Sequence, residues 1–297
     1  MRMLGKRKKT VLCLGFFDSL HKGHLSVIEK AKEIAKNSGA SVTVFSFSGN
    51  LKKVLYGKEE RVVYLEKERL NLLKDMGIKN TYFMPVTKKY LSLSKNKFLD
   101  FLTKKFNISA LVFGTDFRFG KNAEGDAEFI KQYAKDKNIK VAVLNLLSVN
   151  DKKVSTTLVK ELLLGGEITA VNQLLGRKFS ITGKVYKDRG VGTKIGFPTA
   201  NVKYSYDKVS IKTGVYSGVA IVKGKEYKAL INYGTRPTFG GNIPTLEVHL
   251  IDFSGNVYNK TITVFFKEFI REEKKFSGLE ELVAQIKNDL QRVIEND

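Results

Sequence analysis

The sequence has only one cysteine, Cys13, among its 297 residues. A single thiol excludes a framework of intrachain disulfides and is typical of a protein in a reducing compartment. No apolar run approaches the length of a membrane-spanning helix. The basic start from Arg2 to Lys9 and the apolar run after it imitate a secretory signal, but Asp18 ends the run early and no small-residue cleavage site follows. We therefore expect a cytoplasmic protein with no membrane partner.

Negative charge is scarce relative to positive charge, since 52 Lys and Arg against 30 Asp and Glu leave a net charge of +22. Such a charge can indicate a nucleic-acid surface or simply solvated lysine faces. The basic residues are spread along the chain, and no helix-turn-helix, zinc-finger or RNA-recognition pattern is present. We expect no specific nucleic-acid partner, and we keep a non-enzymatic nucleic-acid-binding protein as an alternative.

Histidine is scarce as well, and two of the three histidines lie in one stretch, Gly15-Phe16-Phe17-Asp18-Ser19-Leu20-His21-Lys22-Gly23-His24. An apolar run leads into this stretch and apolar residues at helical spacing follow it, which predicts a strand, a turn and a helix. His21 and His24 would then stand at a helix N-terminus that favours anions, and Gly23 has no Cβ to keep a phosphate away. The two imidazoles could stabilise a leaving pyrophosphate. The alternatives are polar turn residues or a metal pair, although a structural zinc lacks its other ligands.

The first half of the chain alternates between predicted strands and helices. After the first strand and helix, strands are expected over 42–47, 81–86, 110–113 and 141–144, and helices over 62–76, near 98–102 and over 127–137. Such alternation predicts βαβ units and a parallel sheet, with ligands beyond the carboxyl ends of the strands. The turn with His21 and His24 and the loop from Gly114 to Gly120 both lie at such ends.

The pattern changes near Leu175, where a short predicted helix over 168–175 ends. Short strand-like runs over 179–186, 214–222, 227–233, 245–253 and 260–266 are separated by Gly, Asn and Asp turns. They predict a closed antiparallel barrel. An amphipathic helix is expected over about 279–294. We therefore predict an α/β fold with a parallel-sheet domain over 1–175 and a barrel domain over 176–297.

Two further stretches of the first half contain candidate ligand-binding residues. The loop Gly114-Thr115-Asp116-Phe117-Arg118-Phe119-Gly120 could by itself be ordinary packing with a solvated arginine. The segment from Lys153 to Lys160 places Ser155, Thr156 and Thr157 at the start of a helix. Hydroxyl residues there can bind phosphate, but helix capping alone would also explain them.

The barrel half contains a comparable set of motifs. In Gly196-Phe197-Pro198-Thr199-Ala200-Asn201, Thr199 and Asn201 offer the neutral oxygens that Mg²⁺ accepts, and Pro198 stiffens the turn. Glu247 is followed by Val248, His249 and Leu250; a lone glutamate in a strand is more often solvated than catalytic, and His249 is expected to be structural. The stretches 232–239 and 270–276 complete the set.

These motifs resemble those of the bifunctional riboflavin kinase/FMN adenylyltransferases, the bacterial FAD synthetases. The histidine stretch resembles the G-x-F-D-G-x-H-x-G-H signature of nucleotidyltransferases that make dinucleotide cofactors. The loop from Gly114 is similar to the family's flavin loop, and the segment from Lys153 is similar to R-x-S-S-T-x-I-R. The barrel motifs resemble G-F-P-T-A-N, N-x-G-x-R-P-T-F, E-V-H and I-R-x-E-x-K-F in the family's order. The resemblance covers nearly the whole chain.

The resemblance implies a Rossmann-like nucleotidyltransferase domain followed by a β-barrel riboflavin-kinase domain with a terminal helix. It implies two ATP-dependent reactions, riboflavin to FMN and FMN to FAD with release of pyrophosphate, and Mg²⁺ as cofactor. Its implied partners are riboflavin, FMN, FAD and ATP, and the sequence leaves the oligomeric state open. The implied residues are Glu247, His21 and His24 for catalysis; Gly15, Phe16, Asp18, Gly23, Ser155, Thr156, Thr157, Lys160, Gly196 and Pro198 for ATP and phosphate; Asp116, Phe117, Arg118 and Arg271 for flavin; and Thr199 and Asn201 for the metal.

Four positions depart from the family pattern, namely Ser19, Leu20, Lys153 and Lys160. The two lysines stand where arginine is usual, and lysine lacks the planar fork that holds a phosphate through two bonds. We therefore expect a working but slow adenylyltransferase. A kinase-only protein with a degenerate first half is the alternative, while the G-F-P-T-A-N motif argues against a different cofactor adenylyltransferase.

Overall fold

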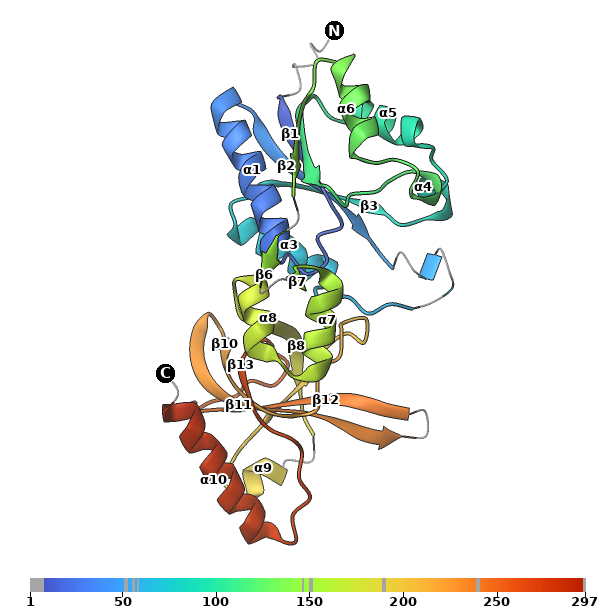
Figure 1. The fold of residues 1–297 in the computed structure, drawn as a ribbon. Coiled ribbons are helices and arrows are strands. Elements are labelled where there is room, and N and C mark those ends of the chain that lie inside the picture. Colours follow the sequence, from blue (N-terminus) through green and yellow to red (C-terminus); the bar gives the residue numbers. More distant parts are fainter. Residues whose placement is uncertain are drawn as a thin grey trace. The chain divides into compact units, whose positions relative to one another are not determined.

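The computed structural model describes residues 8–50, 53–54, 57, 59–145, 147–149, 152–188, 191–238 and 241–295. Most of the basic start, and Phe239 of the N-x-G-x-R-P-T-F motif, lie outside these residues. The chain groups into two compact units, Met1–Thr156 and Thr157–Asp297 (Figure 1). The functional boundary predicted near Leu175 stays a prediction.

The first unit is built on a five-stranded parallel sheet, as predicted. Its strands are β1 (Thr10–Leu14), β2 (Ser41–Ser48), β3 (Asn80–Pro85), β4 (Ile108–Gly114) and β5 (Lys140–Leu144), in the order β3-β2-β1-β4-β5. The residues of β1 are all buried, which explains its continuous apolar run. Because β1 has β2 on one side and β4 on the other, the direction of strand progression reverses there, and the ends of β1 and β4 form a switch point.

Helices cover both faces of this sheet (Figure 1). They are α1 (Lys22–Ser38), α3 (Glu66–Asp75), α4 (Lys88–Leu91), α5 (Lys95–Lys105) and α6 (Ala127–Lys135). Val27, Ile28 and Ala31 of α1 pack in one core with Val11 and Cys13 of β1. Phe98, Leu99 and Leu102 of α5 and Ile130 of α6 pack in the other core with Leu12 and Leu14 of β1. The alternating side chains of β1 thus join the two cores.

Two helix ends show how local chemistry sets the boundaries. Gly39 ends α1 in the left-handed conformation with φ of 62°, as a C-terminal glycine should. The helix predicted over 62–76 begins only at Glu66, because the backbone of Leu65 is extended, with ψ of 157°. The N–H groups of Val63 and Tyr64 before it bind the Asp18 carboxylate. A short hairpin of β6 (Ser148–Val149) and β7 (Lys152–Lys153) follows β5.

The second unit contains the predicted closed antiparallel barrel. Its strands are β8 (Phe179–Tyr186), β9 (Ala200–Lys203), β10 (Gly214–Val222), β11 (Lys225–Thr238), β12 (Gly241–Leu250) and β13 (Thr261–Arg271), closed in the order β10-β11-β12-β9-β8-β13. Five of these strands are predicted from the sequence, whereas β9 is not, because the stretch from Gly196 to Asn201 has the pattern of a metal-binding turn. β11 and β13 also extend five residues beyond their predicted ends.

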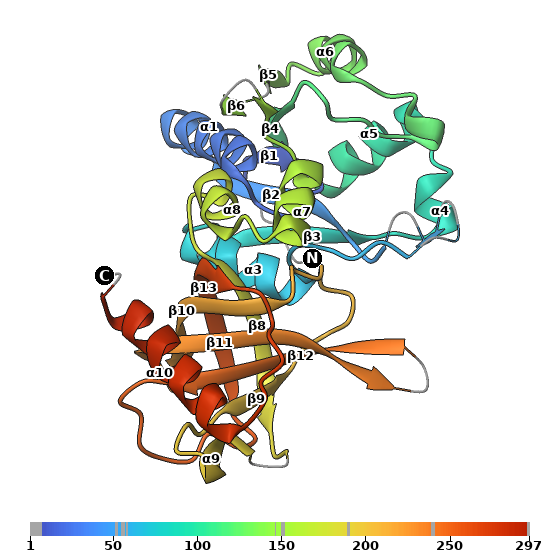
Figure 2. The ribbon, with the colours of Figure 1, turned by 60° about the horizontal axis from the view of Figure 1, so that its bottom comes forward.

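Four helices accompany the barrel, namely α7 (Thr156–Gly165), α8 (Ile168–Leu175), α9 (Val191–Lys194) and α10 (Leu279–Glu295). The Asn172 side chain joins α8 to the barrel, since it accepts a hydrogen bond from Phe179 N–H and donates one to the Phe266 carbonyl. Figure 2 shows α10 along the outside of the barrel, where Val293 packs with Val215 and Leu230. In the described part of the chain, no helix is long and apolar enough to cross a membrane.

Candidate active sites

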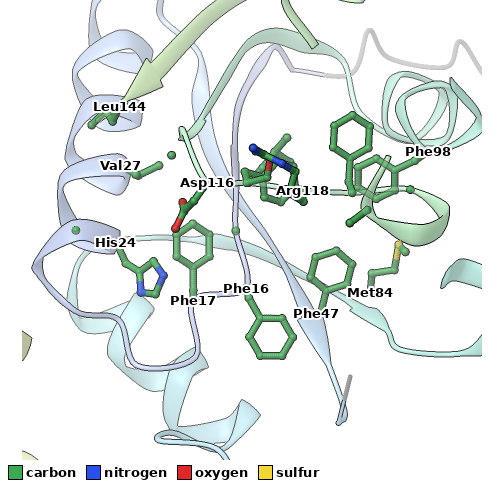
Figure 3. Close-up of a pocket in the computed structure, with 18 of the residues that line it drawn as sticks. Phe16, Phe17, His24, Val27, Phe47, Met84, Phe98, Asp116, Arg118 and Leu144 are labelled. Atoms are coloured by element: carbon green, nitrogen blue, oxygen red, sulfur yellow. The ribbon is translucent and has the colours of Figure 1, made fainter. Parts of the chain in front are cut away.

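A cavity of about 700 Å³ opens at the carboxyl ends of β1 and β4, where the strand order reverses. Its lining includes eight of the predicted site residues, Gly15, Phe16, His21, Gly23, His24, Asp116, Phe117 and Arg118. Figure 3 shows His24 at one side of the cavity and Phe98 and Met84 at the other. The cavity thus lies where the switch-point rule predicts a ligand site.

The turn after β1 has an unusual backbone. Phe17 and Leu20 adopt positive φ angles of 51° and 47°, which are uncommon for residues with a Cβ. Each such residue costs on the order of 1–3 kcal/mol and persists only when its surroundings determine it. Both side chains are fully buried in the core beneath α1. Their burial offsets the strain and holds the turn in one conformation.

Two buried charged residues, Asp18 of the turn itself and Arg69 of α3, hold the turn in place. Asp18 is 4% exposed, and its Oδ1 accepts a 2.9 Å hydrogen bond from Val63 N–H. Arg69, also 4% exposed, donates 2.8 Å hydrogen bonds to the carbonyls of Phe16 and Phe47. Burial lowers the pKa of Arg69, and the negative charge of Asp18 opposes that shift. Asp18, predicted as an ATP ligand, thus turns its carboxylate into the protein and is absent from the cavity lining.

The two histidines form a stacked pair at the start of α1. The ring centroids of His21 and His24 lie 3.7 Å apart with only 8° between the planes. His21 caps the helix, because its Nδ1 accepts a 3.2 Å hydrogen bond from His24 N–H. A neutral His21 ring therefore carries its proton on Nε2. A Cβ at Gly23 would lie 3.1 Å from the His21 ring, so glycine allows this close packing.

The other end of the cavity is aromatic. The Phe117 and Phe119 rings stack at 5.7 Å with 18° between their planes, and Phe98 contacts Phe119 at 5.1 Å. Phe47 and Met84 complete this wall (Figure 3). A flat apolar ring system fits such a surface, whereas a phosphate does not. The cavity therefore suits a ligand with an aromatic end and an anionic end.

Asp116 and Arg118 lie on the loop between these two ends (Figure 3). The Arg118 Nη1 donates to the carbonyls of Thr115 and Phe117, which shapes the loop after β4. The Asp116 Oδ2 lies 3.4 Å from the Lys153 Nζ in an exposed ion pair. This contact brings the lysine that replaces the family's arginine to the rim of the cavity.

The hydroxyl segment lies beside the histidine turn. The Thr156 Oγ1 is 3.0 Å from the Ser19 Oγ, and Val154 is a buried part of the cavity wall. Thr157 and Lys160 follow in α7 and belong to the second unit. The phosphate-binding role of this segment stays a prediction.

The second site lies on the barrel around Glu247. In the strand register, Glu247 of β12 is opposite Asn201 of β9 and Asn232 of β11. Residues directly opposite on neighbouring strands place their side chains on the same face. Leu246 and Val248 are buried on the other face. Glu247 is thus flanked by two amides on the outer face of the barrel.

The loop before β9 is fixed by the third histidine of the chain. The His249 Nδ1 hydrogen-bonds to the Pro198 carbonyl at 2.8 Å, and the Phe197 ring contacts the His249 ring edge to face at 5.9 Å. These contacts hold the loop of residues 196–199 against β12, the strand that contains Glu247. His249 therefore has the structural position that its alternation with apolar neighbours indicates.

Asn201 has an unsatisfied oxygen. The residue is 8% exposed, and its Oδ1 has no hydrogen-bond partner among the described residues. A buried amide oxygen without a partner is costly, and a divalent cation is a partner that would satisfy it. Among the residues that the structure describes, no three His, Cys, Asp or Glu side chains gather as a metal centre. Neutral oxygens from Thr199 and Asn201 therefore fit Mg²⁺ better than they fit zinc.

Glu273 is a further candidate residue, which none of the motif assignments named singly. A Cβ at Gly234 would lie only 2.4 Å from the Glu273 Oε1, so this carboxylate lies directly over β11. Burial, and next the negative charge of Glu247, raise the pKa of Glu273 above its ordinary value. The sequence signal that could have pointed to Glu273 was its position in the stretch 270–276, one of the motifs of the barrel half.

Arg271, predicted as a flavin ligand, is engaged elsewhere. Its Nε and Nη2 bind the Asp289 carboxylate of α10 at 2.8–3.1 Å, and its Nη1 donates to the Glu272 carbonyl. Asp289 is 2% exposed and also accepts from the Gln285 side chain. The pair anchors α10 to the barrel, and the flavin contact of Arg271 stays a prediction.

Comparison with known proteins assigns each half to a family. The FAD synthetase family model matches residues 4–158, and the riboflavin kinase model matches residues 175–296. A bifunctional riboflavin kinase/FMN adenylyltransferase of Bacillus subtilis is 33% identical over 97% of this chain and 93% of its own. The protein of the same name from Listeria monocytogenes is 31% identical over 95% and 90%. A Streptococcus pneumoniae structure described as a macrolide-efflux protein has 27% identity and a TM-score of 0.91, covering 98% of this chain and 95% of that one.

Proposed function

The chain belongs to the bifunctional riboflavin kinase/FMN adenylyltransferase family, and we propose that its two units divide the two reactions between them. FAD forms in the cavity of the parallel-sheet unit, and FMN forms on the barrel face around Glu247. The observation that carries this proposal is the cavity at the β1–β4 switch point, with stacked histidines at one end and stacked phenylalanines at the other. Its two ends match the phosphates and the ring system of a flavin nucleotide.

In the cavity, an oxygen of the FMN phosphate attacks the α-phosphorus of ATP, and the bond to the β-phosphate breaks to release pyrophosphate. The attacking phosphate is already ionised, so no strong base is needed. His21 presents its Nε2–H beside the N-terminus of α1, and both favour the negative charge that develops on the leaving group. Phe117 and Phe119 hold the flavin ring, which fixes the distance of attack.

On the barrel, Glu247 accepts the proton of the riboflavin 5′-hydroxyl while that oxygen attacks the γ-phosphorus of ATP, and ADP leaves. Asn201 and Asn232 flank Glu247 and orient the phosphates and the hydroxyl. Thr199 and Asn201 would hold Mg²⁺, which when bound neutralises the charge of the transferring phosphates. Glu273 is a second carboxylate near this face, and burial and then the charge of Glu247 raise its own pKa.

The test supplies the full chain with riboflavin, ATP and Mg²⁺ and separates the flavins by chromatography. Glu247→Gln should abolish FMN formation but still convert supplied FMN to FAD. His24→Ala should nearly eliminate FAD but leave FMN formation intact. The two variants thus serve as folding controls for each other. If the unmodified chain makes FMN but no FAD, the kinase-only alternative is correct; normal kinase turnover in Glu247→Gln would refute Glu247 as the base.

A further inference from the structure

Two of the positions that depart from the family pattern take part in contacts of one short segment, residues 153–156, to which Lys153 itself belongs. Ser19 meets Thr156, and Lys153 meets Asp116. Both contacts hold residues 153–156 against the rim of the cavity, one on the side of β1 and the other on the side of β4. The departures are therefore connected in space although they lie far apart in the sequence.

The contact of Ser19 is the stronger of the two. Ser19 is fully buried, and its Oγ lies 3.0 Å from the Thr156 Oγ1. A buried hydrogen bond is worth more than an exposed one because its groups cannot bind water instead. The Lys153–Asp116 pair is half exposed on both sides, where ion pairs contribute little and are screened by salt.

Ser19 also lies where a small shift would reach the reacting groups. The residue before it, Asp18, is tied to Val63, and the residue after it, Leu20, is held at positive φ. The next residue is His21, which caps α1 and stacks on His24. Because the turn is fixed on both sides of Ser19, its hydroxyl transmits the position of Thr156 to the histidines.

Residues 153–156 are also held at Val154, between the two end contacts. The Val154 N–H donates to the Leu147 carbonyl at 2.9 Å, and the buried Val154 side chain forms part of the cavity wall. Residues 153–156 therefore lie across the cavity edge with a contact near each end and one between. A segment fixed at three points keeps a constant distance to the histidine turn.

We propose that Ser19 is a positioning residue for adenylyl transfer, whose hydroxyl sets the spacing between the histidine pair and residues 153–156. The weaker Lys153–Asp116 ion pair lies at the far end of the same segment. This inference rests on the proposed adenylylation in this cavity. It goes beyond that function because Ser19 does not line the cavity and acts through Thr156.

The test compares Ser19→Ala, Thr156→Val and the double variant in the full chain. Each single change should lower kcat for FAD formation from supplied FMN about 3- to 10-fold, with smaller changes in KM for FMN. The double variant should be no slower than the slower single variant, because both changes remove the same contact. Ser19→Thr should restore most of the rate, since it keeps the hydroxyl.

FMN formation from riboflavin by the same samples controls for folding, because its site lies in the other unit. Lys153→Gln should have a smaller effect that disappears at high salt. Multiplicative losses in the double variant, or an unchanged kcat in Ser19→Ala, would overturn the inference while leaving the proposed function intact. Loss of stability in Ser19→Ala with no rescue by Ser19→Thr would also overturn it. Absence of FAD formation by the unmodified chain would refute both.

Discussion

Arg69 gives the sharpest test of how the histidine turn is supported. Its guanidinium is buried, and it donates to the Phe16 carbonyl, the Phe47 carbonyl and the Ser46 hydroxyl. It also lies over the rings of Phe16 and Phe83, at 5.6 and 5.0 Å from their centroids. Arg69 thus joins α3, the end of β2 and the turn after β1 at one point.

The expected cost of Arg69→Met follows from these contacts. The change removes the donor of the Phe47 carbonyl, while the Phe16 carbonyl keeps a hydrogen bond from the Ser46 hydroxyl. A buried unsatisfied group costs about 1–3 kcal/mol. It also removes a buried cation, whose desolvation penalty is regained, and methionine fills most of the stem volume. We expect the first unit to lose about 1–3 kcal/mol of unfolding free energy. Because Phe16 lies in the turn, FAD formation should fall at least tenfold.

The measurement combines urea unfolding with separate assays of FAD and FMN formation. Lys67→Met on the exposed side of the same helix is the matched control and should change neither quantity. Arg69→Lys should be intermediate, because one ammonium replaces a fork that reaches several acceptors. FMN formation should stay near normal in all three variants. If Arg69→Met lost less than about 1 kcal/mol of unfolding free energy and still formed FAD at the full rate, the reasoning would be refuted.

Four other predictions follow from the same structure. Asp289→Ala leaves Arg271 without its partner and frees α10, so the barrel unit should lose about 2–4 kcal/mol in urea unfolding, less than for a fully buried pair. Calorimetry should show weak Mg²⁺ binding by the free protein and tighter binding with ADP or ATP, an increase that Asn201→Ala should remove. Because the folded state raises the pKa of Glu273 above 4.5, ionising this carboxyl as pH rises above that value lowers the free energy of unfolding. Glu273→Gln should flatten this decline in unfolding free energy when it is measured from pH 4 to 8. Lys160→Arg should leave FAD formation unchanged or raise it by up to about tenfold in an assay with supplied FMN.

Local patterns predicted much of the fold. The apolar run before the histidine turn, the glycine after α1 and the helix over 168–175 all have the predicted form. The errors arose where tertiary contacts override local preference. The helix α3 starts late, after an extended stretch in which the N–H groups of Val63 and Tyr64 bind Asp18, a contact that no pattern in residues 62–76 reveals.

The candidate sites also divide into features that local patterns predict and features that depend on tertiary contacts. The histidine turn and the loop after β4 were brought together in the prediction because parallel strands bring their carboxyl ends to one edge. Glu247 was singled out by its motif alone. Motif spacing missed β9, since a strand of four residues inside a ligand motif has no periodicity of its own. It also did not show that Asp18 and Arg271 direct their charges at protein partners, because a residue's type does not fix the direction of its side chain.

The sequence by itself determined the order of elements, the two kinds of sheet and the family, since these depend on local periodicity and on motifs within short stretches. Only the tertiary structure decided which charged groups face a cavity and which bind partners within the protein. Ser19 and Thr156 become neighbours, Glu273 lies beside Glu247, and Arg69 supports Phe16 only because the chain closes long loops. Such contacts depend on burial and direction in space, which a linear pattern does not specify.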